Sequence, residues 1–297
     1  MWLIIALLAP IFYAVSNIFD NILANKSFKN TTTLVFYTSL FNVVFVIFLF
    51  LFSNFSLPSI SLLPIFILLG IINILYLFPY YKGLQNDDTS IVSSFFGLGR
   101  IFIPIWAFFI IGEQLSALEY IGIALVIIGS VLLSVRGSFK DIKFSKAIFY
   151  ILFASFIISF EGVLLKYLFE HGVPVIVGIG GEMFISFVYG LFFLLHKKTR
   201  QDIVENFFLF KKKILIFFGE EAATFVAFFS GSYALSIAPV SLVQGIGALT
   251  PFFVLAYAKL LNKKYAYLFN EQIGIDNTLK KIILFSITAL GVFLIAR

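Results

Sequence analysis

Long, nearly uninterrupted runs of apolar residues recur along the chain, separated by short polar connectors. A helix of about 20 apolar residues spans the hydrocarbon core of a bilayer and satisfies its own backbone there. The runs are too long and too continuously apolar for the alternating strands of a membrane β-barrel. The pattern predicts an all-α membrane protein with ten transmembrane helices, over residues 2–23, 33–52, 62–81, 90–111, 118–135, 146–169, 174–195, 214–236, 240–261 and 279–296.

Lysine and arginine residues are distributed one-sidedly among the connectors. Connectors 53–61, 112–117, 170–173 and 237–239 contain none, whereas the alternate connectors are basic. The positive-inside rule places basic connectors in the cytoplasm, which predicts that both termini lie outside. We expect an integral, multi-pass protein of a prokaryotic inner membrane. The basic connectors carry Lys26, Lys29, Lys82, Arg136, Lys140, Lys143, Lys146, Lys197, Lys198, Arg200, Lys211, Lys212, Lys213, Lys263, Lys264, Lys280 and Lys281.

Composition indicates the same class of protein. Hydrophobic residues make up 61% of the chain, whereas soluble domains contain about 45–50%. Charged residues make up 12% and the mean hydropathy is +1.06. A soluble fold of this composition would expose large apolar patches, and a disordered chain requires low hydrophobicity. Both classes are therefore excluded.

The reactive residues exclude several kinds of chemistry. The chain has no cysteine, and its two histidines, His171 and His196, fall in predicted connectors. Thiolate metal sites, cysteine nucleophiles and Ser-His-Asp triads therefore lack their components. No phosphate-binding G-x-x-x-x-G-K-[ST] loop occurs, so we expect no cofactor and no direct use of ATP. The net charge of +6 is attributed to lysines beside anionic membrane lipids, and no nucleic-acid partner is expected.

Two connectors are longer than a turn requires. Residues 201–213 and 263–276 mix bulky apolar residues with charged ones. Such a mixture favours a short helix lying in the headgroup region. A solvated linker is the alternative for each.

The two halves of the chain show a weak internal repeat. A shift of 151 residues aligns Leu84, Ser90 and Val92 with Leu235, Ser241 and Val243, and the match continues through Phe102/Phe253 and Ala107/Ala258. Because each half contains five helices, an odd number, the second half must enter the membrane from the opposite side. The expected domains are two inverted five-helix repeats, residues 1–137 and 146–297, as in many secondary transporters.

Several motifs resemble the end of an EamA repeat of the drug/metabolite transporter superfamily. They are the helix 90–111, Gly112-Glu113, Tyr120-Ile121-Gly122 and Ile128-Gly129-Ser130-Val131. In the second half Pro251 and Gly291-Val292 fit, but Lys263-Lys264 stand in place of Gly-Glu, and Arg100 stands where the family usually has proline. The resemblance implies a ten-helix transporter without naming a substrate. Its members often have cytoplasmic termini, unlike the arrangement that the charge pattern predicts.

Charged residues within the predicted helices require a polar environment. Each costs roughly 2.5–3.5 kcal/mol at the bilayer centre on insertion scales, so we expect them to face the bundle interior or a wet cavity. The residues are Arg100, Glu161, Lys166, Glu182 and Glu221. Glu113 and Glu119 flank a predicted loop and are expected to be solvated. Asp20 is read either as part of a cavity or as solvated near the inner membrane face.

Polar residues at helical spacing on several helices point to one shared cavity. Tyr13, Ser16, Asn17, Asp20 and Asn21 form a stripe at i, i+3, i+4, i+7 and i+8, and Asn73, Tyr76 and Tyr80 form another. Hydrogen bonds that only hold helices together remain the alternative for each residue. The predicted substrate-binding residues are Asn17, Tyr76, Tyr80, Arg100, Glu161, Lys166, Glu221 and Gln244.

These observations favour a secondary transporter that moves a small metabolite by alternating access. Amino acids, drug-like molecules and nucleotide-type solutes remain open as substrates. The surplus of carboxylates suggests that the site binds protons or a cationic group, and Arg100 is expected to bind an anionic group or to pair with Glu161.

Other functions and several partners are left open by the sequence. A lipid-headgroup flippase and a channel are the alternatives from the transport class, and an intramembrane enzyme, suggested by Glu220-Glu221, is the alternative from another class. Expected partners are the small-molecule substrate, membrane lipids and protons. A monomer and a homodimer both remain open.

Overall fold

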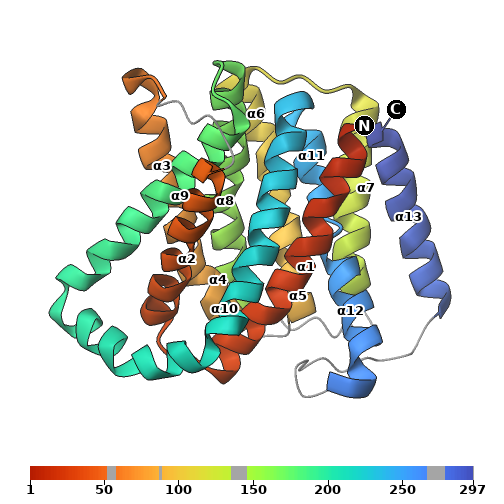
Figure 1. Ribbon diagram of the computed structural model, residues 1–297. Helices are drawn as coiled ribbons and strands as arrows, with labels where there is room; N and C mark the ends of the chain where they lie inside the picture. The colour runs from red at the N-terminus through yellow and green to blue at the C-terminus, as the bar shows by residue number, and fades with distance from the viewer. Residues whose placement is uncertain (52–57, 87–88, 135–145, 266–277, 297) are drawn as a thin grey trace.

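The computed structural model describes residues 1–51, 58–86, 89–134, 146–265 and 278–296, and every regular element within these ranges is a helix (Figure 1). The elements are α1 (Trp2–Lys26), α2 (Thr31–Leu51), η1 (Ile60–Leu62), α3 (Leu63–Leu75), α4 (Leu77–Leu84), α5 (Thr89–Leu98), η2 (Gly99–Ile101), α6 (Phe102–Ile111), α7 (Ala117–Ser134), α8 (Lys146–Glu170), α9 (Val175–Phe192), η4 (Phe193–Leu195), α10 (Lys197–Ile237), α11 (Val240–Gly247), α12 (Thr250–Tyr265) and α13 (Thr278–Ala296).

The helical segments match the ten predicted spans. Seven stretches are long and apolar enough to cross a membrane. Three shorter apolar stretches, Phe95–Ile111, Ala117–Gly129 and Ser286–Ile295, coincide with the fourth, fifth and tenth predicted helices. The prediction of an all-α, multi-pass membrane protein is confirmed. Three predicted spans are each built from shorter helices: η1, α3 and α4 form the third, α5, η2 and α6 the fourth, and α11 and α12 the ninth.

The first helices of the two halves run in opposite directions. In Figure 1, α1 leads away from the end of the molecule that carries both termini, whereas α8 leads toward that end. The packing partners also follow a two-fold pattern: α1 packs on α10 and α12, and α8 correspondingly packs on α3, α4, α5 and α6. The pairs α2–α9 and α7–α13 each join one helix to its counterpart in the other half. This pattern is that of an inverted repeat, although the predicted boundary at residues 138–145 lies outside the described residues.

Helix α10 differs from its prediction. It has 41 residues, and at about 1.5 Å per residue it is roughly twice as long as the ~30 Å hydrocarbon core. The predicted interfacial helix 201–213 is therefore the first part of α10 and not a separate element. The core holds this part in place, because Tyr37 OH donates to Ile203 O at 2.6 Å and the Tyr37 ring stacks on Phe210 at 4.2 Å. Of the other predicted interfacial segment, residues 266–276 lie outside the described residues.

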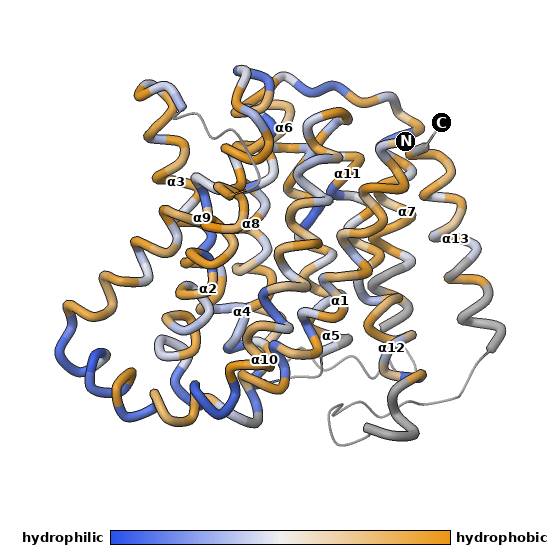
Figure 2. Tube along the Cα trace, viewed as in Figure 1, coloured by the Kyte–Doolittle hydropathy of each residue, from blue (hydrophilic) through white to orange (hydrophobic). Residues whose placement is uncertain are grey.

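The two ends of the molecule differ in polarity. Both termini lie at one end, and the hydrophilic start of α10 crosses the opposite end (Figures 1 and 2). The described basic connectors, after α1, after α4 and before α10, also lie at that opposite end. We call it the basic end, and the other the terminal end. That the basic end faces the cytoplasm stays a prediction.

Helices α7 and α13 approach each other at glycine. A Cβ atom on Gly291 would lie 2.7 Å from Gly122 O and 2.9 Å from Val126 N. Small residues at such a contact let two backbones pack closely in a membrane, where dispersion forces drive helix association. The contact joins the last helix of each half, so it ties the halves together at one side of the bundle.

We expect Gly291→Ala to lower the free energy of unfolding by about 1–3 kcal/mol, because the added methyl group must push two backbones apart. Thermal unfolding of the detergent-purified protein measures the effect. Gly219→Ala is the matched control, since its Cβ would lie 3.4 Å from the Phe19 ring, an ordinary contact. Equal melting temperatures for Gly291→Ala and the parent protein would contradict this explanation.

Candidate functional site

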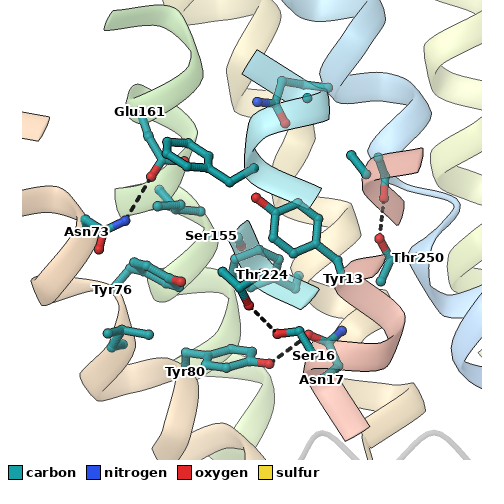
Figure 3. A pocket seen from close by; sticks show the side chains of 18 of the residues that line it. Tyr13, Ser16, Asn17, Asn73, Tyr76, Tyr80, Ser155, Glu161, Thr224 and Thr250 are labelled. Carbon is teal, nitrogen blue, oxygen red and sulfur yellow. Dashed lines mark hydrogen bonds between the residues drawn. The ribbon is translucent and has the colours of Figure 1, made fainter. Parts of the chain in front are cut away.

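A polar cavity of about 170 Å³ lies between helices of the two halves (Figure 3). A water molecule needs about 10–15 Å³ of such cavity volume. The cavity therefore has room for on the order of ten waters or a small solute. Its wall comes from α1, α2, α3, α4, α5, η2, α6, α8, α9, α10, α11 and α12. The polar residues that line it include Tyr13, Ser16, Asn17, Asp20, Asn73, Tyr76, Tyr80, Ser93, Arg100, Ser159, Glu161, Glu220, Glu221, Thr224, Ser232, Gln244 and Thr250.

Nearly all predicted site residues line this cavity. They are Asn17, Tyr76, Tyr80, Arg100, Glu161, Glu221 and Gln244. Lys166 of α8 is the exception, because its side chain reaches the end of α10 and not the cavity. The helical spacing explains the agreement, because residues at i, i+3, i+4 and i+7 share one helix face. Their role in binding a substrate remains a prediction.

The helices that carry Arg100 and Gln244 are interrupted beside the cavity. The three-residue 3-10 turn η2 separates α5 from α6, and residues 248–249 separate α11 from α12. The two interruptions lie at nearly equivalent positions in the 151-residue repeat. Broken helices expose backbone groups and side chains toward the interior of a transporter, and commonly form its binding site.

One amide joins two carboxyl groups on different helices. Asn73 Nδ2 donates to Glu161 Oε1 at 3.3 Å and to Glu182 Oε1 at 3.2 Å, and Figure 3 shows Asn73 pointing toward Glu161. The Glu182 residue is fully buried. Helix α9 therefore contributes directly to the polar interior, and its carboxyl group belongs to the same cluster as Glu161.

A second carboxyl cluster lies between α1, α4 and α10. Tyr80 OH lies 2.9 Å from Asn17 Oδ1 and 3.0 Å from Asp20 Oδ2. Asp20 is only 5% exposed, so its alternative interpretation as a solvated residue near the membrane face is wrong. Glu220 Oε1 accepts from Ser16 and from Thr224, both at 2.9 Å. The sequence analysis placed Glu221 in the site but not Glu220, although the i, i+4 spacing of Glu220 and Thr224 was a usable signal.

Arg100 is held by a glutamine and not by a carboxylate. Its Nη1 donates to Gln244 O at 2.8 Å and to Gln244 Oε1 at 2.6 Å. Gly247 makes room for the guanidinium, because a Cβ there would lie 2.6 Å from Arg100 Cζ. Among the described residues, Arg100 forms no ion pair with Glu161 or another carboxylate, so the expected Arg100–Glu161 pair is not made. Arg100 Nε is buried without a partner.

Acidic groups outnumber basic ones around the cavity. Its described surroundings contain five carboxyl residues and one basic residue, Arg100; the carboxyl residues are Asp20, Glu161, Glu182, Glu220 and Glu221. Four carboxyl oxygens among these groups are buried without a hydrogen-bond partner: Asp20 Oδ1, Glu182 Oε2, Glu220 Oε2 and Glu221 Oε1. Among the described residues, no group of three or more acidic or histidine side chains is arranged to hold a metal ion. The chemistry of the site therefore suits a proton or an organic cation.

Lys166 caps the C-terminal end of α10. Its Nζ donates to Leu235 O at 3.0 Å and to Ala238 O at 3.1 Å, where α10 ends. These carbonyls have no partner within the helix, and a cation there also interacts favourably with the helix dipole. Lys166 thus does not take part in the cavity in this structure.

The expectation that Glu113 is solvated is wrong. Its carboxylate accepts from Val240 N at 2.6 Å and from Ser241 N at 3.0 Å. These are the first two N–H groups of α11. Glu119 is half-buried, and its carboxylate accepts from Ser116 N at 2.7 Å, which caps its own helix. Glu113 therefore connects the first half of the chain to the second.

We expect Lys166→Met to lower the free energy of unfolding by about 1.5–3 kcal/mol, because two hydrogen bonds from a charged donor are lost. The variant should leave the concentration for half-maximal transport unchanged. Thermal unfolding and transport kinetics measure the two effects, with the exposed Lys198→Met as control. A changed concentration for half-maximal transport, together with an unchanged free energy of unfolding, would instead indicate that Lys166 binds the substrate.

Comparisons with known proteins agree with this architecture. Residues 1–135 match the EamA-like transporter family. A protein of known crystal structure is similar in fold over 97% of this chain and 98% of its own, with a TM-score of 0.61 and 14% sequence identity. At that identity the similarity shows the fold alone. No curated protein matches the chain.

The family match covers the half of the chain that carries the Gly112-Glu113 turn and Arg100. The resemblance derived from these motifs is confirmed for that half, whereas the second EamA-like repeat stays a prediction. Residues 1–135 therefore match the EamA-like transporter family, which belongs to the drug/metabolite transporter superfamily.

Proposed function

We propose that this protein is a secondary transporter that carries a small solute with a cationic group by alternating access. The observation that carries the proposal is the group of five carboxyl residues around one cavity between the two halves, of which four are buried and Glu161 is half-buried. A cavity enclosed by inverted halves is suited to opening first on one side and then on the other. The match of residues 1–135 to a transporter family supports the same class of function.

The carboxyl groups have two uses in such a cycle. An ionised carboxylate in a low-dielectric site is unfavourable unless a cation or a proton accompanies it. A solute amine and a proton would therefore compete for the same oxygens. Exchange of one for the other, on opposite sides of the membrane, couples solute movement to the proton gradient.

Arg100 supplies a positive charge beside the carboxyl groups of the cavity. Its Nη1 is occupied by Gln244, but its Nε is buried without a partner in the cavity wall. A guanidinium binds carboxylates with charge-assisted hydrogen bonds. A zwitterionic solute of amino-acid type would place its amine near Glu161 and its carboxylate near Arg100.

We expect Glu161→Gln to slow solute exchange by about tenfold or more and to abolish its dependence on the pH gradient. Glutamine still accepts the hydrogen bond from Asn73, but it carries neither a charge nor a titratable proton. Counterflow of pooled, labelled amino acids, nucleosides and cationic drugs in proteoliposomes measures both properties. Glu119→Gln, at a position outside the cavity lining, is the control. Unchanged exchange without any pH dependence would refute the role of Glu161, and permeation without counterflow would indicate a channel.

We expect Gly247→Ala to raise the half-saturation concentration about tenfold for solutes that carry an anionic group, and to leave simple amines unaffected. The added methyl group displaces the Arg100 guanidinium. Gly219→Ala, outside the cavity lining, is the matched control. Equal effects on amines and zwitterions would show that Arg100 does not recognise the anionic group.

A further inference from the structure

The turn between α10 and α11 is held by side chains from both halves of the protein. Lys166 of α8 binds the carbonyls of Leu235 and Ala238 on one side of the turn. Glu113, which follows α6, binds the N–H groups of Val240 and Ser241 on the other side. The turn lies at the terminal end of the molecule, where α11 begins (Figure 1).

Local geometry directs Glu113 toward this turn. Gly112 adopts a left-handed conformation, with φ +68°, and ends α6. The next N–H, of Glu113, returns to Ala107 O at 3.1 Å, which turns the chain away from the helix axis. Both carboxylate oxygens then meet free N–H groups at the positive end of α11, the most favourable place for an anion on a helix.

The same turn forms one end of the cavity wall. Leu235 precedes it, Val243 and Gln244 follow it within one helical turn, and all three line the cavity. Gln244 is also the partner of Arg100. Movement of the start of α11 would therefore both open the terminal end of the cavity and disturb the Arg100 contact.

One of the two bonds has a counterpart at the basic end. The 151-residue shift makes Leu84 equivalent to Leu235, and Asn25 Nδ2 donates to Leu84 O at 2.8 Å, as Lys166 donates to Leu235 O. In each half, the first helix therefore binds the end of the third. Because these bonds stay within one half, they do not oppose a movement of one half against the other.

Among the described residues, the Glu113 bond has no such counterpart. It joins the two halves, and in the sequence the 151-residue shift makes Lys264 equivalent to Glu113, and Thr89 and Ser90 equivalent to Val240 and Ser241. A lysine side chain has donors but no acceptor, so it does not bind helix N–H groups. Bonds between the halves at the basic end, Tyr37 to Ile203 and Asn30 to Asp202, join α2 to α10 and lie away from the α4–α5 turn.

We propose that Glu113 is a one-sided latch: it keeps the cavity shut at the terminal end, so that the resting protein opens more readily at the basic end. Each transport cycle breaks the two Glu113 bonds when the terminal end opens. The inference rests on the proposed alternating access. Glu113 touches no solute and acts through the position of α11, which makes it a positioning residue.

Site-specific labelling tests the latch directly, because the chain contains no cysteine. A single Ser232→Cys reports on the cavity, since Ser232 lines it and is only 1% exposed. A membrane-impermeant thiol reagent is applied to sealed vesicles of either orientation. Separate Ser61→Cys and Lys198→Cys proteins, at exposed positions of the terminal and basic ends, identify the side that the reagent reaches.

In the parent protein we expect faster labelling of Ser232→Cys from the basic end. Glu113→Ala should raise the labelling rate from the terminal end about tenfold, and Glu113→Gln should raise it less, because glutamine retains one acceptor oxygen. Glu119→Ala, which loses a cap within its own helix, should leave both rates unchanged. A merely structural role of Glu113 would change the labelling rate from both ends, and not from the terminal end alone.

Two results would overturn the latch: terminal-end labelling within about twofold of the parent in Glu113→Gln and Glu113→Ala, or an equal rise from both ends, which indicates general loosening. If Glu113→Ala does not fold, Glu113→Gln alone decides between these outcomes. Counterflow in the same vesicles keeps the two proposals apart. Absence of counterflow in the parent, together with one-sided labelling, would refute transport and retain the latch.

Discussion

Hydrocarbon surrounds this protein, so every charged group in its interior must be compensated by other groups of the bundle. Lys166 uses two backbone carbonyls at the end of a helix, and Arg100 uses a glutamine. The carboxyl groups use an amide, hydroxyl groups and a tyrosine. Donors of this kind satisfy some oxygens and leave others without partners. A solvated cavity is the physical consequence, because only water, a proton or a polar solute completes the set.

The cavity also depends on the way that the two halves meet. Inverted halves bring the interrupted fourth and ninth spans together, so that Arg100 of η2 contacts Gln244 of α11 directly. Arg100 reaches Gln244 only because Gly247 has no side chain. The symmetry is approximate where it matters most: the Gly112-Glu113 turn binds the other half, and Lys263-Lys264 stand in the corresponding place of the second copy. The two ends of the bundle therefore differ in this pair of residues.

The success of the sequence predictions follows from two simple geometric constraints, the thickness of the bilayer and the helical repeat. The thickness of the bilayer sets the length of each apolar run, so ten helices were evident without knowledge of their packing. The helical repeat of 3.6 residues groups polar positions on one face, which identified Asn17, Tyr76, Tyr80 and their neighbours. The interruptions at Tyr76 and η2 and the full length of α10 were not evident, because local propensity barely distinguishes a continuous apolar helix from a broken one.

Thus the sequence by itself determined the class of protein, the number of spans, the inverted halves and many polar residues of the cavity wall, since each depends on composition and spacing along one chain. The tertiary structure alone decided which polar groups meet. Lys166 and Glu161 share a helix and a polar character, yet one caps α10 and the other joins Glu182 through Asn73. Glu113 and Glu119 flank one loop, yet only Glu113 reaches the other half. Partners of this kind come from helices far apart in sequence, and their choice depends on three-dimensional packing that no local pattern records.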